Sequence, residues 1–240
     1  MDAVTTSTPW EEKLFKEQGL SEVYYVGEGV DVERIEEETA KMQSEENVFT
    51  IIFIGAKDYG KGYYHTLLAV NELAKKVGYN KIRMIVIGRG NMIGAPSSLR
   101  DEVAEAYASL RKHESVEDYV FLSEREKLRH LKRAHVVLLP SKAETIPLVT
   151  LEGWALKKPS ILGDIPTVRS FLEQDGGGAV LVDFADVQGI AQNLESFYAN
   201  RDLLNAIGSR GHAILLKIGT LKYVSNRLAS VYERILSEKN

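Results

Sequence analysis

The chain has 240 residues, of which 44% are apolar, and its 30 Lys and Arg against 34 Asp and Glu give a formal net charge of −4. This composition excludes a disordered chain or a collagen, and its mild acidity argues against a general binder of nucleic acid or anionic membranes. Because there is no cysteine, disulfides, zinc–thiolate sites, iron–sulfur clusters and thiol catalysis are excluded. No apolar run is long enough to cross a bilayer and the first residues do not form a signal peptide, so we expect a cytoplasmic protein.

Short elements precede the main part of the chain. The pattern predicts a strand at 3–6 and then a helix that has Pro9 in its first turn and Gly19 beyond its end. A second short strand at 23–26 and an acidic helix near 31–43 follow, and 44–47 is interpreted as a linker.

The middle of the chain alternates apolar runs with amphipathic segments. Strands are predicted at 48–55, 82–88, 119–122, 135–140, 159–163 and 179–183, and helices at 63–77, 97–113, 123–134, 147–157 and 167–174. Several of the strands lack polar alternation, which is typical of strands covered on both faces. The order predicts an α/β fold with a doubly wound parallel sheet, in which ligands bind beyond the carboxyl ends of the strands.

From residue 186 onward the chain is predicted to be helical. Its last segment repeats apolar side chains on one face, namely Leu221, Val224, Leu228, Val231 and Ile235. This face would pack on its own domain, on a missing domain or on a second copy, and packing on the core is the favoured interpretation.

A turn rich in glycine and lysine follows the first strand of the middle region. It runs from Gly55 to Gly62 and matches the G-x4-G-K core of a phosphate-binding P-loop, but Gly62 occupies the position of the Ser or Thr that holds magnesium. A P-loop nucleotidase is therefore the weaker interpretation, and it would require magnesium-dependent ATP hydrolysis. Lys57 and Lys61 at the start of a helix suit an anion, whereas the alternative is an ordinary turn with solvated lysines.

Three other features have structural interpretations. Gly88-Arg-Gly90 is followed by Gly94, one residue too late for a dinucleotide fingerprint, so we interpret it as a tight turn that permits close approach of a ligand. The five histidines show no metal-ligand spacing, and we predict no metal site. Gly176-Gly-Gly178 is interpreted as a turn between a helix and the next strand.

The most informative segment is PSKAETIPLVTLEGWA at 140–155, which runs from a buried strand through a loop into a helix. On a helical wheel one arc holds Leu148, Val149, Leu151, Ala155 and Leu156, with Glu152 near its middle. A carboxylate on an apolar face needs a hydrogen-bonding partner, which is either a buried basic side chain or a polar ligand.

A second acid, Glu144, lies in the loop before this helix. The free amides of Thr145, Ile146 and Leu148 would point there toward an anion. Two acids and a group of amides at the end of a strand suit a ligand that is anionic and carries hydroxyl groups, as a nucleotide-sugar does.

The same segment resembles the signature of retaining glycosyltransferases of the GT-B fold, group 1 (family 4). Glu144 and Glu152 occupy its two glutamate positions, and Pro140, Ser141, Pro147, Leu148 and Ala155 also match. The resemblance extends over almost the whole chain. Gly29-Val-Asp31 is similar to the interdomain strand ending, Gly55 with Lys61-Gly62 to the phosphate loop, and Gly88 with Gly90 to the next glycine turn.

The resemblance implies the C-terminal, donor-binding half of a GT-B fold with a helical tail. Residues 1–43 would be a remnant of the N-terminal domain and the interdomain linker, 44–185 a Rossmann-like nucleotide-sugar-binding core, and 186–240 helices that pack on that core. It implies that Glu152 binds ribose hydroxyls, that Glu144 contacts the donor sugar, and that Lys61 and the amides after Glu144 hold the diphosphate. The donor would be a nucleotide-diphosphate-sugar, with no cofactor and no metal.

These implications give a set of candidate residues. Glu144 and Lys61 are the candidate catalytic residues. The candidate donor-binding residues are Gly55, Ala56, Lys57, Lys61, Gly88, Leu122, Glu144, Thr145, Ile146, Leu148 and Glu152.

The sequence also departs from the family's pattern. Ala56, with Lys57 beside it, stands where the family usually has an Arg, and lysine is a point charge and not a bidentate fork. Lys158 and Trp154 stand at positions that are commonly Gly and Met. The acceptor-binding domain is almost absent, since 2–19 resembles only its last strand and helix, so we expect that domain to be separate or missing, and any membrane association to come through it.

Two functions are consistent with these observations. The first is hexosyl transfer from a nucleotide-sugar to an acceptor hydroxyl with retention of configuration, to which this chain would supply the donor-binding half. The second is a non-catalytic nucleotide-sugar-binding module or subunit, which Ala56 favours.

Overall fold

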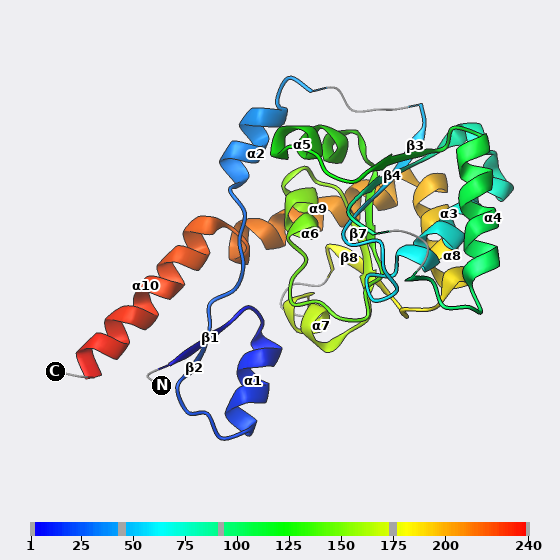
Figure 1. Cartoon of the computed structure of the whole chain (residues 1–240). Coiled ribbons are helices and arrows are strands. Elements are labelled where there is room, and N and C mark those ends of the chain that lie inside the picture. The colour runs from blue at the N-terminus through cyan, green and yellow to red at the C-terminus, as the bar shows by residue number, and fades with distance from the viewer. Residues whose placement is uncertain (1–2, 43–46, 91–93, 173–176, 239–240) are drawn as a thin grey trace.

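The computed structural model describes residues 3–42, 47–90, 94–172 and 177–238. Most of the predicted linker at 44–47 and the first glycine of the Gly176–Gly178 turn lie outside these residues. Figure 1 shows a sheet covered by helices, from which the first two strands, helix α1 and the last helix extend as an arm.

The body contains a sheet of six parallel strands in the order β5-β4-β3-β6-β7-β8. Their bounds are β3 Phe49–Ile54, β4 Ile82–Ile87, β5 Val116–Tyr119, β6 Val136–Leu139, β7 Ser160–Gly163 and β8 Ala179–Val182. The chain leaves β3 toward one edge and returns to β6 on its other side, which is the doubly wound arrangement that the alternating pattern predicted. This confirms the α/β, Rossmann-like fold class.

Helices cover both faces of this sheet (Figure 1). On one face, α3 (Tyr63–Val77) packs against α4 (Arg100–Lys112) and α8 (Val187–Ala199). On the other, α5 (Glu124–Arg133) packs against α6 (Leu148–Ala155), and both contact α2 (Val32–Thr39). A short 3-10 helix at Tyr79–Lys81 precedes β4, α7 (Pro166–Leu172) follows β7, and α9 (Arg201–Ile218) packs against α6 and α8. The central strands are buried on both faces because helices lie on both.

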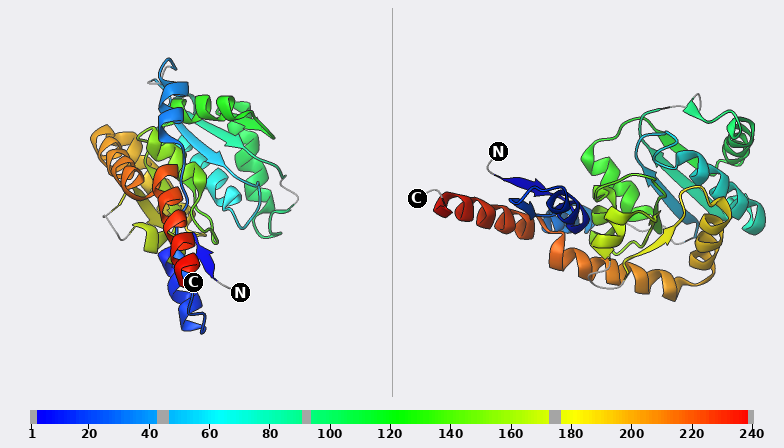
Figure 2. Two further views of the ribbon diagram at one scale, coloured as in Figure 1. Left: turned by 90° about the vertical axis from the view of Figure 1, so that its left-hand side faces the viewer. Right: turned by 90° about the horizontal axis from the view of Figure 1, so that it is seen from below.

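The arm is built from the two ends of the chain. Strands β1 (Val4–Thr6) and β2 (Val23–Tyr25) pair in parallel around α1 (Pro9–Glu17), whose N-terminus Thr8 caps. Helix α10 (Leu221–Glu238) lies beside them, and the Arg227 side chain donates to the main-chain oxygen of Tyr25. Figure 2 shows α10 and the N-terminal elements projecting together from the body.

The position of α10 differs from the expected packing of all of 186–240 on the core. Helices α8 and α9 contact the body, whereas α10 leaves it after the bridge between Val30 and Thr220. Of the predicted apolar face, Val231 is buried but Leu221 is 48% exposed. The periodicity of this segment therefore correctly predicted a helix but not its partner, which is the N-terminal segment.

The edge strand β5 differs from the prediction. The sequence favoured a strand at 119–122, but β5 spans Val116–Tyr119, and Val120 and Phe121 are 63% and 77% exposed. The charged residues Glu117 and Asp118 lie within β5, so its sequence did not show the apolar pattern by which a strand is recognised. Both carboxylates are ion-paired with side chains of neighbouring elements, so an edge strand accommodates them.

No helix in the described parts of the chain is both long and apolar enough to cross a membrane.

Candidate functional site

The loops after β3 and β6 come together at the carboxyl edge of the sheet. The Lys142 amide donates to the Gly60 oxygen at 2.9 Å. Gly62 begins α3 with a φ of +74°, and a Cβ there would lie 2.4 Å from the Pro140 oxygen. Only glycine permits this approach, because its backbone adopts positive φ readily and it has no side chain to collide with Pro140. The two loops that carry Lys61 and Glu144 are thereby held against each other.

Lys61 and Glu144 meet across this junction. The Lys61 ammonium lies 2.5 Å from one Glu144 oxygen, to which the Ser141 hydroxyl also donates at 2.9 Å. The main-chain oxygen of Glu144 accepts from the Thr167 hydroxyl at 2.6 Å, which fixes the loop from its other side. The Lys61 side chain remains 35% exposed, so this pair lies at the surface, where a ligand can reach it.

Glu152 is held by a basic side chain from the neighbouring helix. The Lys127 ammonium on α5 lies 2.7 Å from a Glu152 oxygen and 3.0 Å from Glu124. Burial raises the pKa of Glu152 above its ordinary value, and Lys127 opposes that rise. The sequence left open whether a buried basic side chain or a polar ligand would be the partner of Glu152, and the structure contains the basic side chain, Lys127. Burial of Glu152 is therefore not by itself a sign of a ligand.

The surroundings of Glu152 also differ from the predicted helical wheel. From Val149 to Ala155 every residue of α6 is buried, while Leu148 is 48% exposed and Leu156 is half-buried. A single apolar arc was the wrong description because α6 contacts β6, α9, α5 and α2, which bury the helix on all sides after its first residue.

Lys57 is engaged with an acid on the edge strand. Its ammonium forms an ion pair with Asp118, whose other oxygen accepts from the Tyr107 hydroxyl at 3.0 Å. The side chain of Lys57 is 6% exposed. A buried lysine that is already neutralised does not suit an incoming anion, so the expected contact of Lys57 with the diphosphate does not fit this arrangement.

No side chain in the described part of the chain caps the N-terminus of α6. Pro147 occupies the capping position, and the first turn contains no acidic residue. The first amides of a helix have no partner within it and form a positive end. Among the predicted amide donors, Thr145 and Leu148 are exposed and Ile146 is buried at 4% exposure, so two of the three residues lie at the surface.

The remaining predicted residues also lie along the carboxyl edge. Gly55 and Gly88 follow neighbouring strands, and the Gly55 amide donates to the Ile87 oxygen at 3.0 Å. Ala56 is exposed. Leu122 is half-buried in the loop after β5, directly before the Ser123 cap of α5.

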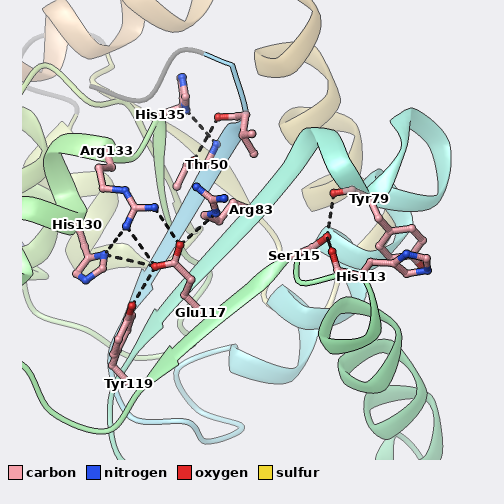
Figure 3. Close-up of polar contacts among 11 residues, drawn as sticks. Thr50, Tyr79, Arg83, His113, Ser115, Glu117, Tyr119, His130, Arg133 and His135 are labelled. Atoms are coloured by element: carbon pink, nitrogen blue, oxygen red, sulfur yellow. Dashed lines mark hydrogen bonds and ion pairs between the residues drawn. The ribbon is translucent and has the colours of Figure 1, made fainter. Parts of the chain in front are cut away.

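A group of polar contacts covers the β5 edge of the sheet (Figure 3). Glu117 lies 2.9 Å from Arg133 of α5 and 3.1 Å from Arg83 of β4, and the Tyr119 hydroxyl donates to it at 3.0 Å. Although burial opposes it, these contacts hold the pKa of Glu117 below its ordinary value. His130 lies against the same cluster, and burial lowers its pKa. This cluster attaches α5 to the sheet.

The described residues contain no cluster of three or more His, Asp or Glu side chains placed to hold a metal ion. The acids and bases of the carboxyl edge instead form pairs.

The family model described as glycosyl transferases group 1 matches residues 34–213, three quarters of the chain. The chain belongs to this family. Its Glu144 and Glu152 both lie within the matched region.

Curated relatives and solved structures agree with this membership. The chain is 22% identical over 191 residues to the O-antigen chain mannosyltransferase C of Escherichia coli, covering 79% of this chain and 47% of that protein. It is 26% identical over 129 residues to a D-inositol 3-phosphate glycosyltransferase of Kineococcus radiotolerans, covering 54% of this chain and 30% of that protein. The chain therefore spans less than half the length of these two proteins.

Similar folds cover nearly the whole chain. The sucrose-phosphate synthase of Thermosynechococcus elongatus matches with a TM-score of 0.79 at 14% identity, over 99% of this chain and 59% of that one. A structure of Anabaena HepE in complex with UDP and glucose matches with a TM-score of 0.76 at 14% identity, over 97% of this chain and 63% of that one. At these identities the likeness concerns the fold.

The sequence of this glycosyl transferase did not reveal which side chains pair with its acidic and basic site residues. Lys127 and Asp118 were not predicted, because they lie on elements far along the chain from Glu152 and Lys57. Ser141, which binds Glu144, belongs to the recognised segment but had no role assigned.

Proposed function

We propose that this chain supplies the donor-binding half of a glycosyltransferase, which moves a hexose from a nucleotide-sugar to an acceptor hydroxyl with retention of configuration. The observation that carries the proposal is the partly exposed Lys61–Glu144 pair, held at the carboxyl edge of a doubly wound sheet within the region that the family model matches. The names of two similar proteins, a mannosyltransferase and a protein in complex with UDP and glucose, support a hexose and a nucleoside diphosphate as ligands.

Such a transfer requires groups at this edge of the sheet that stabilise negative charge and orient the sugar. The bond from the anomeric carbon to the diphosphate oxygen breaks while the bond to the acceptor oxygen forms, so negative charge accumulates on the departing diphosphate, which takes up the proton of the acceptor hydroxyl. Lys61 and the uncapped amides at the start of α6 would stabilise that charge. Glu144 would orient the sugar, since a carboxylate accepts hydrogen bonds from its hydroxyl groups.

Glu152 would bind the ribose hydroxyls together with Lys127. The Glu152 side chain is 12% exposed and that of Lys127 19%, so the pair reaches the surface at one end. We also propose that the acceptor is bound by a separate or missing domain, that the reaction needs no metal or cofactor, and that the protein is cytoplasmic.

The test is calorimetric titration of the full chain with UDP, GDP, ADP and their common sugar conjugates, combined with an assay for slow hydrolysis of the conjugate that binds. We expect wild type to bind one nucleoside diphosphate, Glu152→Ala to weaken that binding, and Glu144→Ala to abolish hydrolysis. A matched control is Glu195→Gln, because Glu195 pairs with Lys76 at 2.6 Å on the far side of α3. It should change neither measurement.

A non-catalytic binding module is the second candidate, and Ala56 in place of the usual arginine favours it. Tight binding of a nucleotide-sugar without hydrolysis would support the module. Absence of binding to every nucleoside diphosphate would contradict both candidates.

A further inference from the structure

The loops after the three central strands carry few positive charges for a diphosphate. In the described residues of the loops that follow β3, β4 and β6, the basic side chains are Lys57, Lys61, Arg89 and Lys142. A diphosphate bound at this edge would carry at least two negative charges, so which of these four is available decides how it is held.

Three of the four contact another side chain, although Lys61 remains 35% exposed and can still reach a ligand. Lys57 is buried against Asp118, and Lys61 pairs with Glu144 at 2.5 Å. The Lys142 ammonium lies over the Tyr59 ring, 5.3 Å from its centroid, where the π-electrons attract a cation. Arg89 differs from them, since it is exposed and its guanidinium has no hydrogen-bond or ion-pair partner within the described part of the chain.

The pairing of β3 with β4 continues beyond both strands and fixes where Arg89 stands. The strands pair from Phe49 with Ile82 to Ile54 with Ile87, and a further bridge joins Lys57 to Gly90. The Lys57 amide donates to the Arg89 oxygen at 2.7 Å. Between these pairs the register sets Arg89 directly beside Ala56.

Two glycines make this continued pairing possible. A Cβ on Gly88 would lie 1.8 Å from the Gly55 oxygen, and one on Gly90 would lie 2.9 Å from the Lys57 oxygen. Arg89 is thus the single side chain that this part of the turn presents. Residues in register on neighbouring strands carry their side chains on the same face, with strands about 4.8 Å apart.

Earlier on β4, a second arginine, Arg83, points to the side of the sheet that α5 covers. Arg83 contacts Glu117, which contacts Arg133 of α5, and Figure 3 shows these three side chains together. Glu152 and Lys127 lie between α5 and α6, on the side of the sheet to which Arg83 points.

We propose that Arg89 binds the diphosphate of the donor, from the strand beside the position where the family usually has arginine and this chain has Ala56. The inference rests on the proposed function, since it assigns a residue to the same site. A guanidinium binds two phosphate oxygens with parallel hydrogen bonds, and Arg89 is available to form them. Strands β4 and β6 lie two strand spacings apart, about 10 Å, so a diphosphate between their loops would be held by Arg89 on one side and Lys61 on the other.

The test compares ligands that differ only in phosphate. Calorimetric titration uses the nucleoside diphosphate that wild type binds among UDP, GDP and ADP, together with its monophosphate and its nucleoside. Arg89→Ala should weaken binding of the diphosphate about 10- to 100-fold, because a charge-assisted contact is lost, and should leave the affinity for the nucleoside unchanged. Binding to the variant should also depend less steeply on salt.

Two further variants sharpen the result. Ala56→Arg in the Arg89→Ala background should restore affinity for the diphosphate, since positions 56 and 89 are in register. Arg210→Ala removes an exposed arginine of α9, far from this edge, and should bind all three ligands as wild type does. Arg89 is exposed, and unchanged melting temperatures would show that each variant is folded.

The outcomes separate this inference from the function on which it rests. If wild type binds a nucleoside diphosphate and Arg89→Ala binds it equally well, Arg89 does not hold the diphosphate, while the proposed function stands. Equal losses for the diphosphate and the nucleoside would likewise assign Arg89 elsewhere. If wild type binds none of the three diphosphates, the proposed function fails and this inference with it.

Discussion

The ammonium group of Lys127 lies 2.7 Å from a carboxylate oxygen of Glu152, although the two residues belong to different helices and are 25 positions apart. Their contact lies between α5 and α6, which pack side by side on the sheet. Glu152 is nearly buried, and its charge is compensated from within the protein. Any ribose at this position would therefore join an existing ion pair.

Lys127→Met should destabilise the protein by about 2–3 kcal/mol at pH 7, because it leaves the Glu152 carboxylate buried without its counter-ion. Burial already raises the pKa of Glu152 above 4.5, and the variant should raise it further. A carboxyl group whose pKa is raised by folding destabilises the fold increasingly as the pH rises above its ordinary value. The loss should thus be smaller at pH 5 than at pH 7, which denaturant unfolding at the two pH values measures.

The double variant Lys127→Met/Glu152→Gln is the control for this mechanism. It removes the charge that Lys127 compensates, so it should recover much of the lost stability at pH 7. Equal destabilisation by Lys127→Met at both pH values would mean that lost packing, and not an uncompensated charge, is the cause.

Gly62 offers a separate test of the junction between the two loops. Gly62→Ala should cost about 2–4 kcal/mol of unfolding free energy, since it adds an unfavourable positive φ and a clash with the Pro140 oxygen. Gly19 also has a positive φ, +94°, but a Cβ there meets nothing within 4 Å. Gly19→Ala should cost only about 1 kcal/mol, so thermal or denaturant unfolding of the two variants isolates the effect of the close approach. Equal losses of unfolding free energy in the two variants would show that Pro140 moves away from the added methyl group at no energetic cost.

The fold was predictable where local pattern and burial agree. Strand β6 is apolar throughout, and β3 and β4 each contain only one residue that is not, Thr50 and Arg83, because helices cover both faces of these strands; this made them recognisable without any knowledge of their neighbours. Helix α3 carries its apolar side chains at helical spacing for the same reason. Strand β5 was misplaced because its own residues are polar and the apolar residues after it are exposed.

The candidate site was predictable only in part. The Pro-Ser-x-x-Glu segment located Glu144 and Glu152, but the sequence did not reveal Lys127 or Asp118, since each meets its partner through the packing of a separate element. Lys57 looked free in the sequence and is buried. Arg89 looked like the variable residue of a glycine turn, and its relation to Ala56 appears only in the register of β3 and β4.

His65 should make the protein less stable in mild acid. It is 2% exposed, its ring lies against Tyr59 and Phe184, and burial lowers its pKa below the ordinary 6.5. A histidine whose pKa is lowered by folding binds fewer protons in the folded state than in the unfolded state, so stability is present above pH 6.5 and falls as the pH drops below it. One such group contributes at most about 1.4 kcal/mol per pH unit.

His65→Leu should flatten this decline. Among the described residues the buried Nδ1 atom of His65 has no hydrogen-bond partner, so leucine removes an uncompensated polar group and should cost little stability at pH 7.5. Unfolding free energies measured from pH 7.5 to pH 5 would show the difference. A variant that declines as steeply as wild type would assign the acid sensitivity to other groups, such as His130, whose pKa burial also lowers.

Lys61 and Glu144 should be nearly uncoupled in folding but coupled in ligand binding. Lys61 is 35% exposed, and pairs at the surface contribute no more than about 1 kcal/mol, so a double-mutant cycle on unfolding with Lys61→Met and Glu144→Gln should give a coupling energy below that value. Glu144→Gln keeps an oxygen that accepts from Ser141, which preserves the loop. In the same cycle measured on nucleotide-sugar binding, the two losses should not add, because Lys61 and Glu144 would contact neighbouring groups of one ligand. Additive losses in binding would mean that the two side chains act at independent places, and that their contact in the free protein has no part in holding the donor.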